Sequence, residues 1–164
     1  MDERGVLFSV SAPDDSLNGE YRLSLHGRHQ VTNALLAVAV AAEAGLGRDE
    51  IRRGLAACQP PPMRMQVWSA GGITVLDDAY NANADSMLAA LQTLKDFPCR
   101  GRRIAVLGDM AELGEGAAQL HADIGQLARS AGITRLWTCG RLSAAASEAF
   151  ADGAEHFSSQ EALI

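Results

Sequence analysis

The second half of the chain alternates short apolar runs with segments of helical pattern, and this alternation constrains the fold most. Apolar runs at residues 73–76 and 104–107 are typical of buried strands. After each run, at 86–97 and 117–131, apolar residues recur at helical spacing. Strands that alternate with helices of this length predict βαβ units. We therefore expect an α/β fold with a mostly parallel sheet flanked by helices.

Similar patterns extend this prediction over the whole chain. Further strands are expected at 5–11, 21–25, 65–69, 135–138 and 155–157, the strand with the apolar run at 104–107 is expected to begin at 103, and further helices are expected at 34–45, 49–58 and 142–150. Ala70-Gly71-Gly72 separates the strands at 65–69 and 73–76, which predicts a hairpin. Because the helix at 86–97 has a suitable length for a crossover, strands 73–76 and 104–107 are predicted to be parallel neighbours.

Three consecutive prolines, residues 60–62, interrupt the pattern between the two halves. They cannot continue a helix and prefer a stiff, extended conformation. We therefore predict a domain boundary here, between 1–59 and 60–164. Arg64 follows the prolines closely and could reach across an interface between domains, although a lone arginine is more often a surface charge.

Composition narrows the class of function. The 164 residues are 48% hydrophobic and 21% charged, as in soluble globular proteins, and the net charge of −6 argues against a nucleic-acid partner. No apolar run is long enough for a membrane span, and the first residues lack a signal-peptide pattern. Three widely separated cysteines without metal-ligand spacing favour reduced thiols, no metal site and a cytoplasmic location. The only lysine, Lys95, lies in a helical segment, so the chain contains no Gly-Lys-Ser or Gly-Lys-Thr phosphate loop.

Carboxylates follow the predicted strand at 73–76. Asp77 and Asp78 come directly after it, where open α/β sheets bind their ligands. A carboxylate there can accept hydrogen bonds from ribose hydroxyls, or it can cap a turn or a helix. The sequence leaves both interpretations open.

Two asparagines continue the same polar stretch. Asn81 and Asn83 can bind adenine or amide groups of a ligand, or they can stabilise a left-handed turn. Asp85 or Ser86 is expected to be the N-cap of the next helix.

A second polar run and three further side chains complete the candidates. Asp109 and Glu112 follow the strand at 104–107 and are expected at the same edge of the sheet. His29 and Asn33 are one helical turn apart and could form a base-binding edge or a local capping network. His121 lies beside the apolar face of its helix, where a lone histidine is more often structural.

Several motifs, in their order and spacing, resemble those of the Mur ligase family. They lie at residues 27–35, 62–64, 77–87, 108–114 and 121. The Asp-Ala-Tyr-Asn-Ala-Asn and Gly-Asp-Met-Ala-Glu-Leu-Gly runs are most similar to the branch of the family that adds D-alanyl-D-alanine. The sequence departs from the family pattern at Gln30, where asparagine is usual, and at Ala84, where proline is common.

The resemblance implies part of an ATP-dependent amide ligase of peptidoglycan synthesis, which serves cell-wall growth, cell shape and division. In this family the central domain holds ATP and Mg²⁺, and the last, Rossmann-like domain swings in with the amino substrate. ATP phosphorylates the carboxylate of a UDP-N-acetylmuramoyl tripeptide, and the amine of D-Ala-D-Ala then attacks the acyl phosphate. Because the phosphate loop is absent, 1–59 is interpreted as the tail of the central domain and 60–164 as an incomplete last domain. We expect the chain to be inactive alone.

Carried over residue by residue, the resemblance implies three groups of site residues. A catalytic role is expected for Arg64. Nucleotide binding is expected at His29, Asn33, Asp77 and Asp78. Substrate binding is expected at Tyr80, Asn81, Asn83, Asp109 and Glu112.

Two alternative functions stay open at this point. One is a related ligase of the folylpolyglutamate or cyanophycin synthetase type, against which the run Tyr80-Asn81-Ala82-Asn83 argues. The other is a non-catalytic nucleotide- or partner-binding domain, which a Rossmann-like fold alone does not exclude. In each case we expect a monomer with small-molecule partners, without nucleic acid and without a membrane span.

Overall fold

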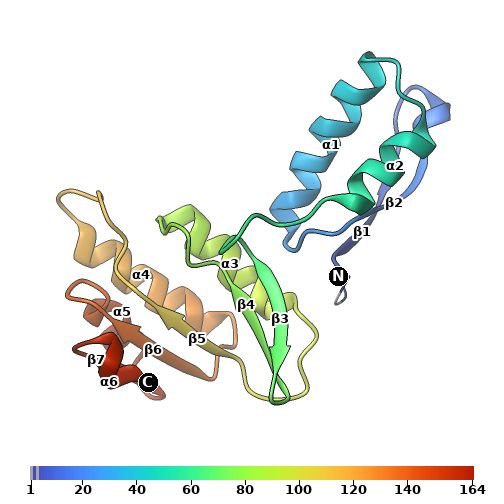
Figure 1. Cartoon of the computed structure of the whole chain (residues 1–164). Coiled ribbons are helices and arrows are strands. Elements are labelled where there is room, and N and C mark those ends of the chain that lie inside the picture. Colours follow the sequence, from blue (N-terminus) through green and yellow to red (C-terminus); the bar gives the residue numbers. More distant parts are fainter. Residues whose placement is uncertain (1, 3) are drawn as a thin grey trace. The chain divides into compact units, whose positions relative to one another are not determined.

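The computed structural model describes residue 2 and residues 4–164, which form two compact units, Met1–Asp78 and Ala79–Ile164 (Figure 1). The sequence analysis places a domain boundary at residues 59 and 60 instead. That boundary stays a prediction, because a compact structural unit and an evolutionary domain need not end at the same residue.

The first unit begins with a β-hairpin that packs against two helices. Strands β1 (Val6–Val10) and β2 (Gly19–Leu23) are antiparallel, and a short 3₁₀ helix, η1 (Asp15–Leu17), lies between them. Helices α1 (Arg28–Glu43) and α2 (Arg48–Ala57) follow. Their shared core consists of Val10, Tyr21, Leu23, Ala34, Val38, Ile51 and Leu55.

Helix α1 begins six residues before its predicted start. The apolar spacing on which the prediction depends begins only at Ala34, whereas the helix starts directly after Gly27. The φ of Gly27 is 104°, outside the range of a right-handed helix, so the helix cannot extend further upstream. His29 and Asn33 therefore lie within the first turns of α1.

The predicted hairpin after the prolines is confirmed. Strands β3 (Gln66–Ala70) and β4 (Ile73–Asp77) are antiparallel, with Ala70 opposite Ile73. Gly71 and Gly72 both have positive φ, 57° and 79°, as a two-residue turn of type I′ requires. The sequence thus specifies this turn through residues that tolerate the left-handed region.

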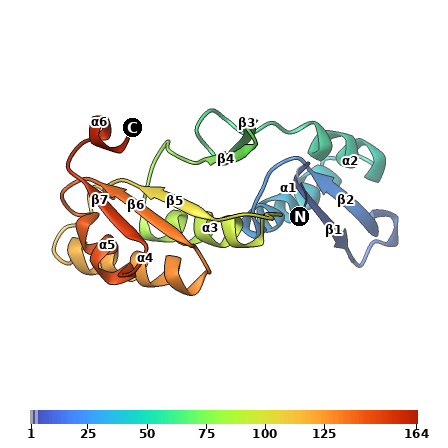
Figure 2. The same cartoon turned by 90° about the horizontal axis from the view of Figure 1, so that it is seen from below.

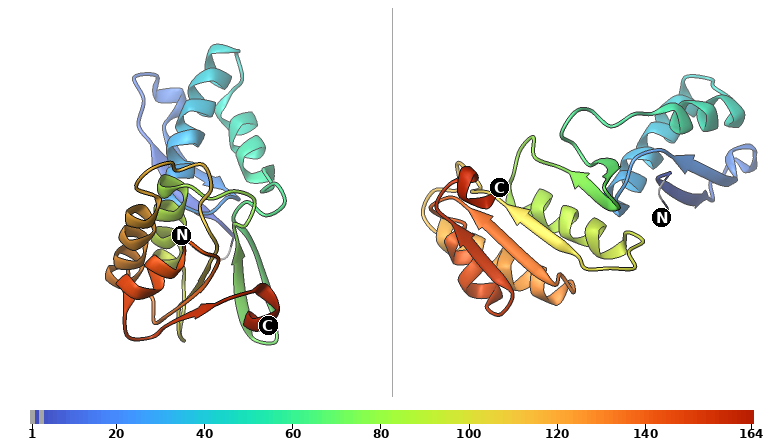
Figure 3. Two further views of the ribbon diagram at one scale, coloured as in Figure 1. Left: turned by 90° about the vertical axis from the view of Figure 1, so that its left-hand side faces the viewer. Right: turned by 60° about the horizontal axis from the view of Figure 1, so that its bottom comes forward.

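The second unit carries the parallel sheet. Its strands are β5 (Ile104–Leu107), β6 (Arg135–Cys139) and β7 (Ala154–Phe157), in that order and all parallel. Its helices are α3 (Ala84–Asp96), α4 (Ala117–Ser130), α5 (Ala144–Phe150) and the short α6 (Gln160–Leu163). Helices α3, α4 and α5 lie on one face of this sheet (Figures 2 and 3). The expected α/β class, with a parallel sheet flanked by helices, is confirmed.

The core of the second unit lies between the sheet and these helices. Its buried residues are Leu91, Ala105, Met110, Ile124, Ala128, Ile133, Leu136, Ala146 and Phe150. Helices α4 and α5 approach closely at Gly125, where an added Cβ would collide with the carbonyl oxygen of Ala146. Since Met110 belongs to this core, the chain that leaves β5 is anchored to it.

The predicted parallel pairing of residues 73–76 with 104–107 stays a prediction, because β4 and β5 belong to different compact units. Within its own unit, β4 pairs with β3, and β5 pairs with β6. A helix of suitable length permits a crossover but does not determine which strands pair. The Gly71-Gly72 turn, by contrast, gives β4 an antiparallel partner directly.

No helix among the described residues combines the length and the apolar character that crossing a membrane would need.

Candidate functional site

Asp78 lies in a charged cluster of the first unit, directly after β4. Its Oδ1 accepts a hydrogen bond from the Met65 amide at 2.9 Å. Burial raises the pKa of Asp78 above its ordinary value, while the Met65 hydrogen bond and the charges of His29 and Arg64 counter this only in part. The structure therefore brings three predicted site residues, His29, Arg64 and Asp78, within electrostatic reach of one another. Asp77, the last residue of β4, is half-buried beside them.

Asn33 has a local partner on helix α1. Its Nδ2 donates a hydrogen bond to Oε1 of Gln30 at 3.2 Å, and the side chain is exposed. Gln30 is the position at which the sequence departs from the family pattern. Its longer side chain thus accepts a hydrogen bond from the Asn33 amide on the surface of the helix. This bond involves neither His29 nor the helix cap, so both interpretations of the pair stay open.

The residues 78–83, which we call the β4 segment, end in a helix cap. Asn83 is the N-cap of α3, where its Oδ1 accepts from the Ser86 amide at 2.8 Å. The hydroxyl of Ser86 in turn accepts from the Asn83 amide at 2.9 Å. The predicted N-cap at Asp85 or Ser86 is therefore wrong, because Asn83 is itself a favoured cap and Ser86 completes the box. Tyr80 and Asn81 are exposed in the same segment.

The residues 108–116, which we call the β5 loop, are held by Asp109. Oδ1 of Asp109 accepts from the amides of Leu142 at 3.0 Å and Ser143 at 2.7 Å, just before helix α5. Burial raises the pKa of Asp109, but the hydrogen bonds from Ser143 and Leu142 outweigh it, so its pKa lies below the ordinary value. A carboxylate predicted to contact substrate thus also joins the β5 loop to the start of α5.

A second anchor of the β5 loop is His121, on helix α4. The side chain is 2% exposed, and its Nε2 accepts from the Met110 amide at 2.9 Å. Its Nδ1 lies 2.7 Å from the carbonyl oxygen of Ala117. The only sequence signal for these contacts is the place of His121 beside the apolar face of its helix, which does not indicate a partner in the β5 loop.

Glu112 is one of three exposed carboxylate side chains of the β5 loop, together with Asp109 and Glu115. It lies between Met110, which is fully buried, and Leu113, which packs against the core. Its φ is 60°, a left-handed conformation that is uncommon for a residue with a side chain. The loop thus presents a carboxylate to solvent from a backbone that is fixed on both sides.

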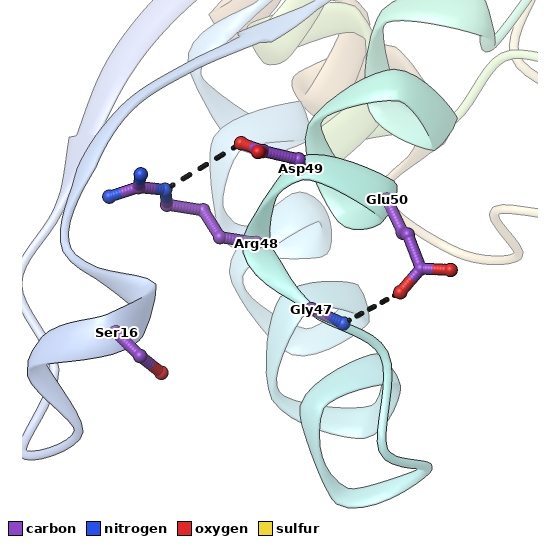
Figure 4. A pocket seen from close by; sticks show the side chains of 5 residues that line it. All are labelled: Ser16, Gly47, Arg48, Asp49 and Glu50. Carbon is purple, nitrogen blue, oxygen red and sulfur yellow. Dashed lines mark hydrogen bonds and ion pairs between the residues drawn. The ribbon is translucent and has the colours of Figure 1, made fainter.

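Two hollows on the surface of the described residues contain none of the predicted site residues. One, of about 410 Å³, is lined by Ser16 and by residues 47–50 at the start of α2 (Figure 4). There Glu50 accepts from the Gly47 amide at 3.0 Å, and Arg48 lies 3.8 Å from Asp49. The other, of about 440 Å³, is lined by Arg4, Arg22, Ser24, His26, Ala56, Gln59, Pro60 and Val67.

The donor groups in residues 2 and 4–164 do not fit a metal ion. No three or more His, Cys, Asp or Glu side chains there form a group that could hold one. The polar side chains described above suit hydrogen bonding to an organic ligand instead.

Comparisons with known proteins agree on one family. The model of the family described as "Mur ligase, glutamate ligase domain" matches residues 63–164. A relative from Escherichia coli (strain K12), named UDP-N-acetylmuramoyl-tripeptide–D-alanyl-D-alanine ligase, is 41% identical over 161 residues, covering 98% of this chain and 34% of the relative. A relative of the same name from Mycobacterium bovis (strain ATCC BAA-935 / AF2122/97) is 48% identical over 139 residues, covering 81% of this chain and 27% of the relative.

A solved structure agrees with the sequence relatives. The UDP-N-acetylmuramoylalanyl-D-glutamyl-2,6-diaminopimelate–D-alanyl-D-alanyl ligase from Acinetobacter baumannii superposes with a TM-score of 0.81 and 30% identity. The match covers 94% of this chain and 33% of that chain. The chain thus spans about a third of the length of the curated relatives it matches.

Proposed function

The chain belongs to the Mur ligase family, and from this we propose that it forms one third of an ATP-dependent amide ligase. The complete ligase joins D-alanyl-D-alanine to a UDP-N-acetylmuramoyl tripeptide in peptidoglycan synthesis. The observation that carries this proposal is the 41% identity to the Escherichia coli relative of that name across 98% of the chain. No comparable observation favours the folylpolyglutamate-type or non-catalytic alternatives.

We assign residues 1–59 to the tail of the central ATP-binding domain and residues 60–164 to the last domain of the ligase. In support, the family match begins at residue 63, directly after the three prolines. A stiff linker of this kind suits a hinge, because it limits the directions in which the last domain can move.

The charged cluster around Asp78 is proposed to bind the nucleotide. In this proposal Asp78 accepts hydrogen bonds from the ATP ribose, and Asp77 beside it also binds the nucleotide. His29 and Asn33 contact the base. Asp78 suits this role because it is half-buried, and its neighbours offset only part of the cost of burying its charge. Hydrogen bonds from ligand hydroxyls would therefore stabilise its ionised form. Arg64, within electrostatic reach of Asp78, contacts phosphate when the ligase closes.

The β4 segment and the β5 loop are proposed to hold the amino substrate. Tyr80, Asn81 and Glu112 are exposed polar side chains there, and Asn83 and Asp109 are near them in sequence. Ala82 and Met110 pack in the same core, which anchors both parts of the chain to one framework. Carboxamides can bond a peptide group or a carboxylate without adding charge that would repel phosphate.

ATP phosphorylates the tripeptide carboxylate, and the dipeptide amine attacks the acyl phosphate to give an amide, ADP and phosphate. The phosphate loop and the Mg²⁺ ligands are proposed to belong to the part of the ligase outside this chain. We further propose that the ligase works in the cytoplasm as a monomer on small-molecule substrates.

Phosphate release tests the proposal. The complete ligase should release phosphate when ATP, the tripeptide precursor and D-alanyl-D-alanine are all present, and the isolated chain should release none above background. Glutamate in place of the dipeptide should not support release. Phosphate release that depends on glutamate would favour the folylpolyglutamate-type alternative. Phosphate release by the isolated chain would contradict the proposal that the active site is shared between this chain and the rest of the ligase.

A further inference from the structure

The partners of His121 indicate which ring nitrogen donates and which accepts a hydrogen bond. The carbonyl oxygen of Ala117 can only accept, so Nδ1, at 2.7 Å from it, must carry a proton. The Met110 amide can only donate, so Nε2, at 2.9 Å, must present its lone pair. In this geometry the ring of His121 links the Ala117 carbonyl of α4 to the Met110 amide of the β5 loop.

The peptide bond between Asp109 and Met110 is held from two helices. Its N–H donates to His121 on α4, while the adjoining Asp109 carboxylate accepts from the two amides before α5. The Met110 side chain is fully buried in the core. Three contacts to separate elements thus fix the β5 loop at its first turn, so this turn cannot move without breaking a tertiary contact.

This anchoring has a visible consequence at Glu112. Two residues after the Met110 amide, the backbone of Glu112 is left-handed, with a φ of 60°, and glycine would adopt this conformation without a steric penalty. Gly114 and Gly116, with φ of 63° and 95°, do so in the same loop. Glu112 keeps its carboxylate exposed despite that penalty, which the surrounding contacts of the β5 loop offset.

We propose that His121 is a positioning residue, which through the Met110 amide holds the β5 loop so that Glu112 meets the ammonium group of the amino substrate. This inference rests on the proposed ligase function. An ionised carboxylate accepts hydrogen bonds only and so matches an ammonium group, whereas it would repel phosphate. His121 does not touch the substrate, because its ring is buried between Ala117 and Met110.

The test compares two substitutions at His121 in the complete ligase. His121→Leu removes the acceptor, and His121→Gln keeps a carbonyl oxygen at a similar reach from the helix. Ile124→Val, which trims another buried core side chain of the same helix without removing a hydrogen-bond acceptor, is the matched control. We expect His121→Leu to raise the KM for D-alanyl-D-alanine at least about tenfold while the KM for ATP stays within about twofold. His121→Gln should restore much of the loss, and Ile124→Val should change neither KM.

A double-mutant cycle places the effect at Glu112. Glu112→Gly should preserve or raise the melting temperature, since glycine relieves the left-handed backbone, yet it should raise the KM for the dipeptide. If His121 acts through Glu112, His121→Leu adds little to the KM in the Glu112→Gly background. Additive effects, or an unchanged dipeptide KM in His121→Leu, would overturn the inference.

A structural measurement separates this inference from the ligase function itself. Hydrogen–deuterium exchange in peptides that cover 108–116 should be slow in the unaltered protein, fast in His121→Leu and intermediate in His121→Gln. Equal exchange in all three overturns the positioning role whether or not the protein is active. A different outcome is the expected exchange pattern together with an unaltered ligase that fails to use the dipeptide. That result would refute the proposed function and the substrate role of Glu112, but it would support the role of His121 in holding the β5 loop.

Discussion

The β5 loop and the β4 segment both carry polar side chains after a strand, yet they are held in different ways. In the β5 loop, Asp109 bonds amides that lie 33 and 34 residues further along the chain, and His121 holds Met110 from 11 residues away. In the β4 segment, Asn83 and Ser86 bond each other within a single helical turn. Tertiary contacts therefore fix the first, and local capping fixes the second.

This difference separates residues that hold the fold from residues that are presented to a ligand. A hydrogen bond to a charged group contributes roughly 1.5–3 kcal/mol, and a helix N-cap about 1 kcal/mol. Substitutions at the anchors of the β5 loop should therefore affect stability more than those in the β4 segment. Exposed residues of either part, such as Asn81 and Glu112, should affect ligand binding with little change in stability.

The largest loss of stability is expected for Gly140→Ala. Its φ is 133°, and an added Cβ would collide with the Asp109 carboxylate that accepts the two amides. Backbone strain and a displaced carboxylate together should lower the free energy of unfolding by about 2–4 kcal/mol. Urea unfolding of the variant and the unaltered protein measures this difference.

The control for Gly140→Ala is the same substitution in an Asp109→Ala background. Because the collision partner is then absent, only the strain at residue 140 remains, and the loss should shrink by at least about 1 kcal/mol. An equal loss in both backgrounds would show that Gly140 does not act through Asp109.

The next effect is expected for Asp109→Ala, at about 2 kcal/mol at neutral pH, because two amides lose a charged acceptor. The pKa of Asp109 is lowered in the folded state, so its contribution is fully present above the ordinary aspartate pKa of about 3.9. It is lost as the pH falls through the lower pKa of the folded state. The unfolding free energies of the variant and the unaltered protein should therefore converge in acid. If the two unfolding free energies differ by the same amount at neutral pH and at pH about 2, the ionised Asp109 carboxylate does not stabilise the fold through these amides.

A smaller effect is expected in the β4 segment, where Asn83→Ala removes the N-cap of α3 and should cost about 1 kcal/mol. Asn81→Ala is the matched control, because Asn81 is exposed two residues away, and its change should stay within about 0.5 kcal/mol. Thermal unfolding of both variants gives the comparison. Equal melting temperatures of the two variants would show that Asn83 stabilises the fold no more than the exposed Asn81 does.

The smallest change in stability is expected for Arg64→Ala, within about 0.5 kcal/mol, because the side chain is exposed. In the complete ligase the same substitution should lower kcat more than it raises the KM for ATP, since the proposed phosphate contact forms only on closure. Steady-state kinetics with ATP as the varied substrate measure the two constants. An unchanged kcat with a large rise in KM would contradict the closure role.

Local signals allowed much of the fold to be predicted from the sequence. Gly71-Gly72 indicated a two-residue hairpin turn, and the alternation of apolar runs with helical patterns indicated the α/β class. The pairing of β4 with β5 stays a prediction, because the two strands belong to different units and a crossover length limits strand pairing without selecting it. The helix cap was misplaced by two residues, since Asn83, Asp85 and Ser86 all suit an N-cap and only the backbone conformation decides among them.

The candidate site residues stay a prediction from the sequence, which does not indicate the hydrogen bonds that these residues make. Asp109 was recognised as a polar side chain at a strand end, but its bonds to Leu142 and Ser143 depend on where α5 begins. The hydrogen bond between His121 and Met110 joins a helix to a loop, and no sequence motif indicates that these two residues are partners. Such contacts arise from the packing of α4 against the sheet, which sequence periodicity does not encode.

The most direct test of the central claim is a ligation assay on a chimera. In it, this chain replaces the matching third of the Escherichia coli relative, with which it shares 41% identity. If the chain supplies the amino-substrate side of the ligase, mass spectrometry should detect the precursor extended by D-alanyl-D-alanine, formed only with ATP. A folded chimera that binds ATP but forms no extended product, or extends the precursor with a different amino acid instead, would contradict the account.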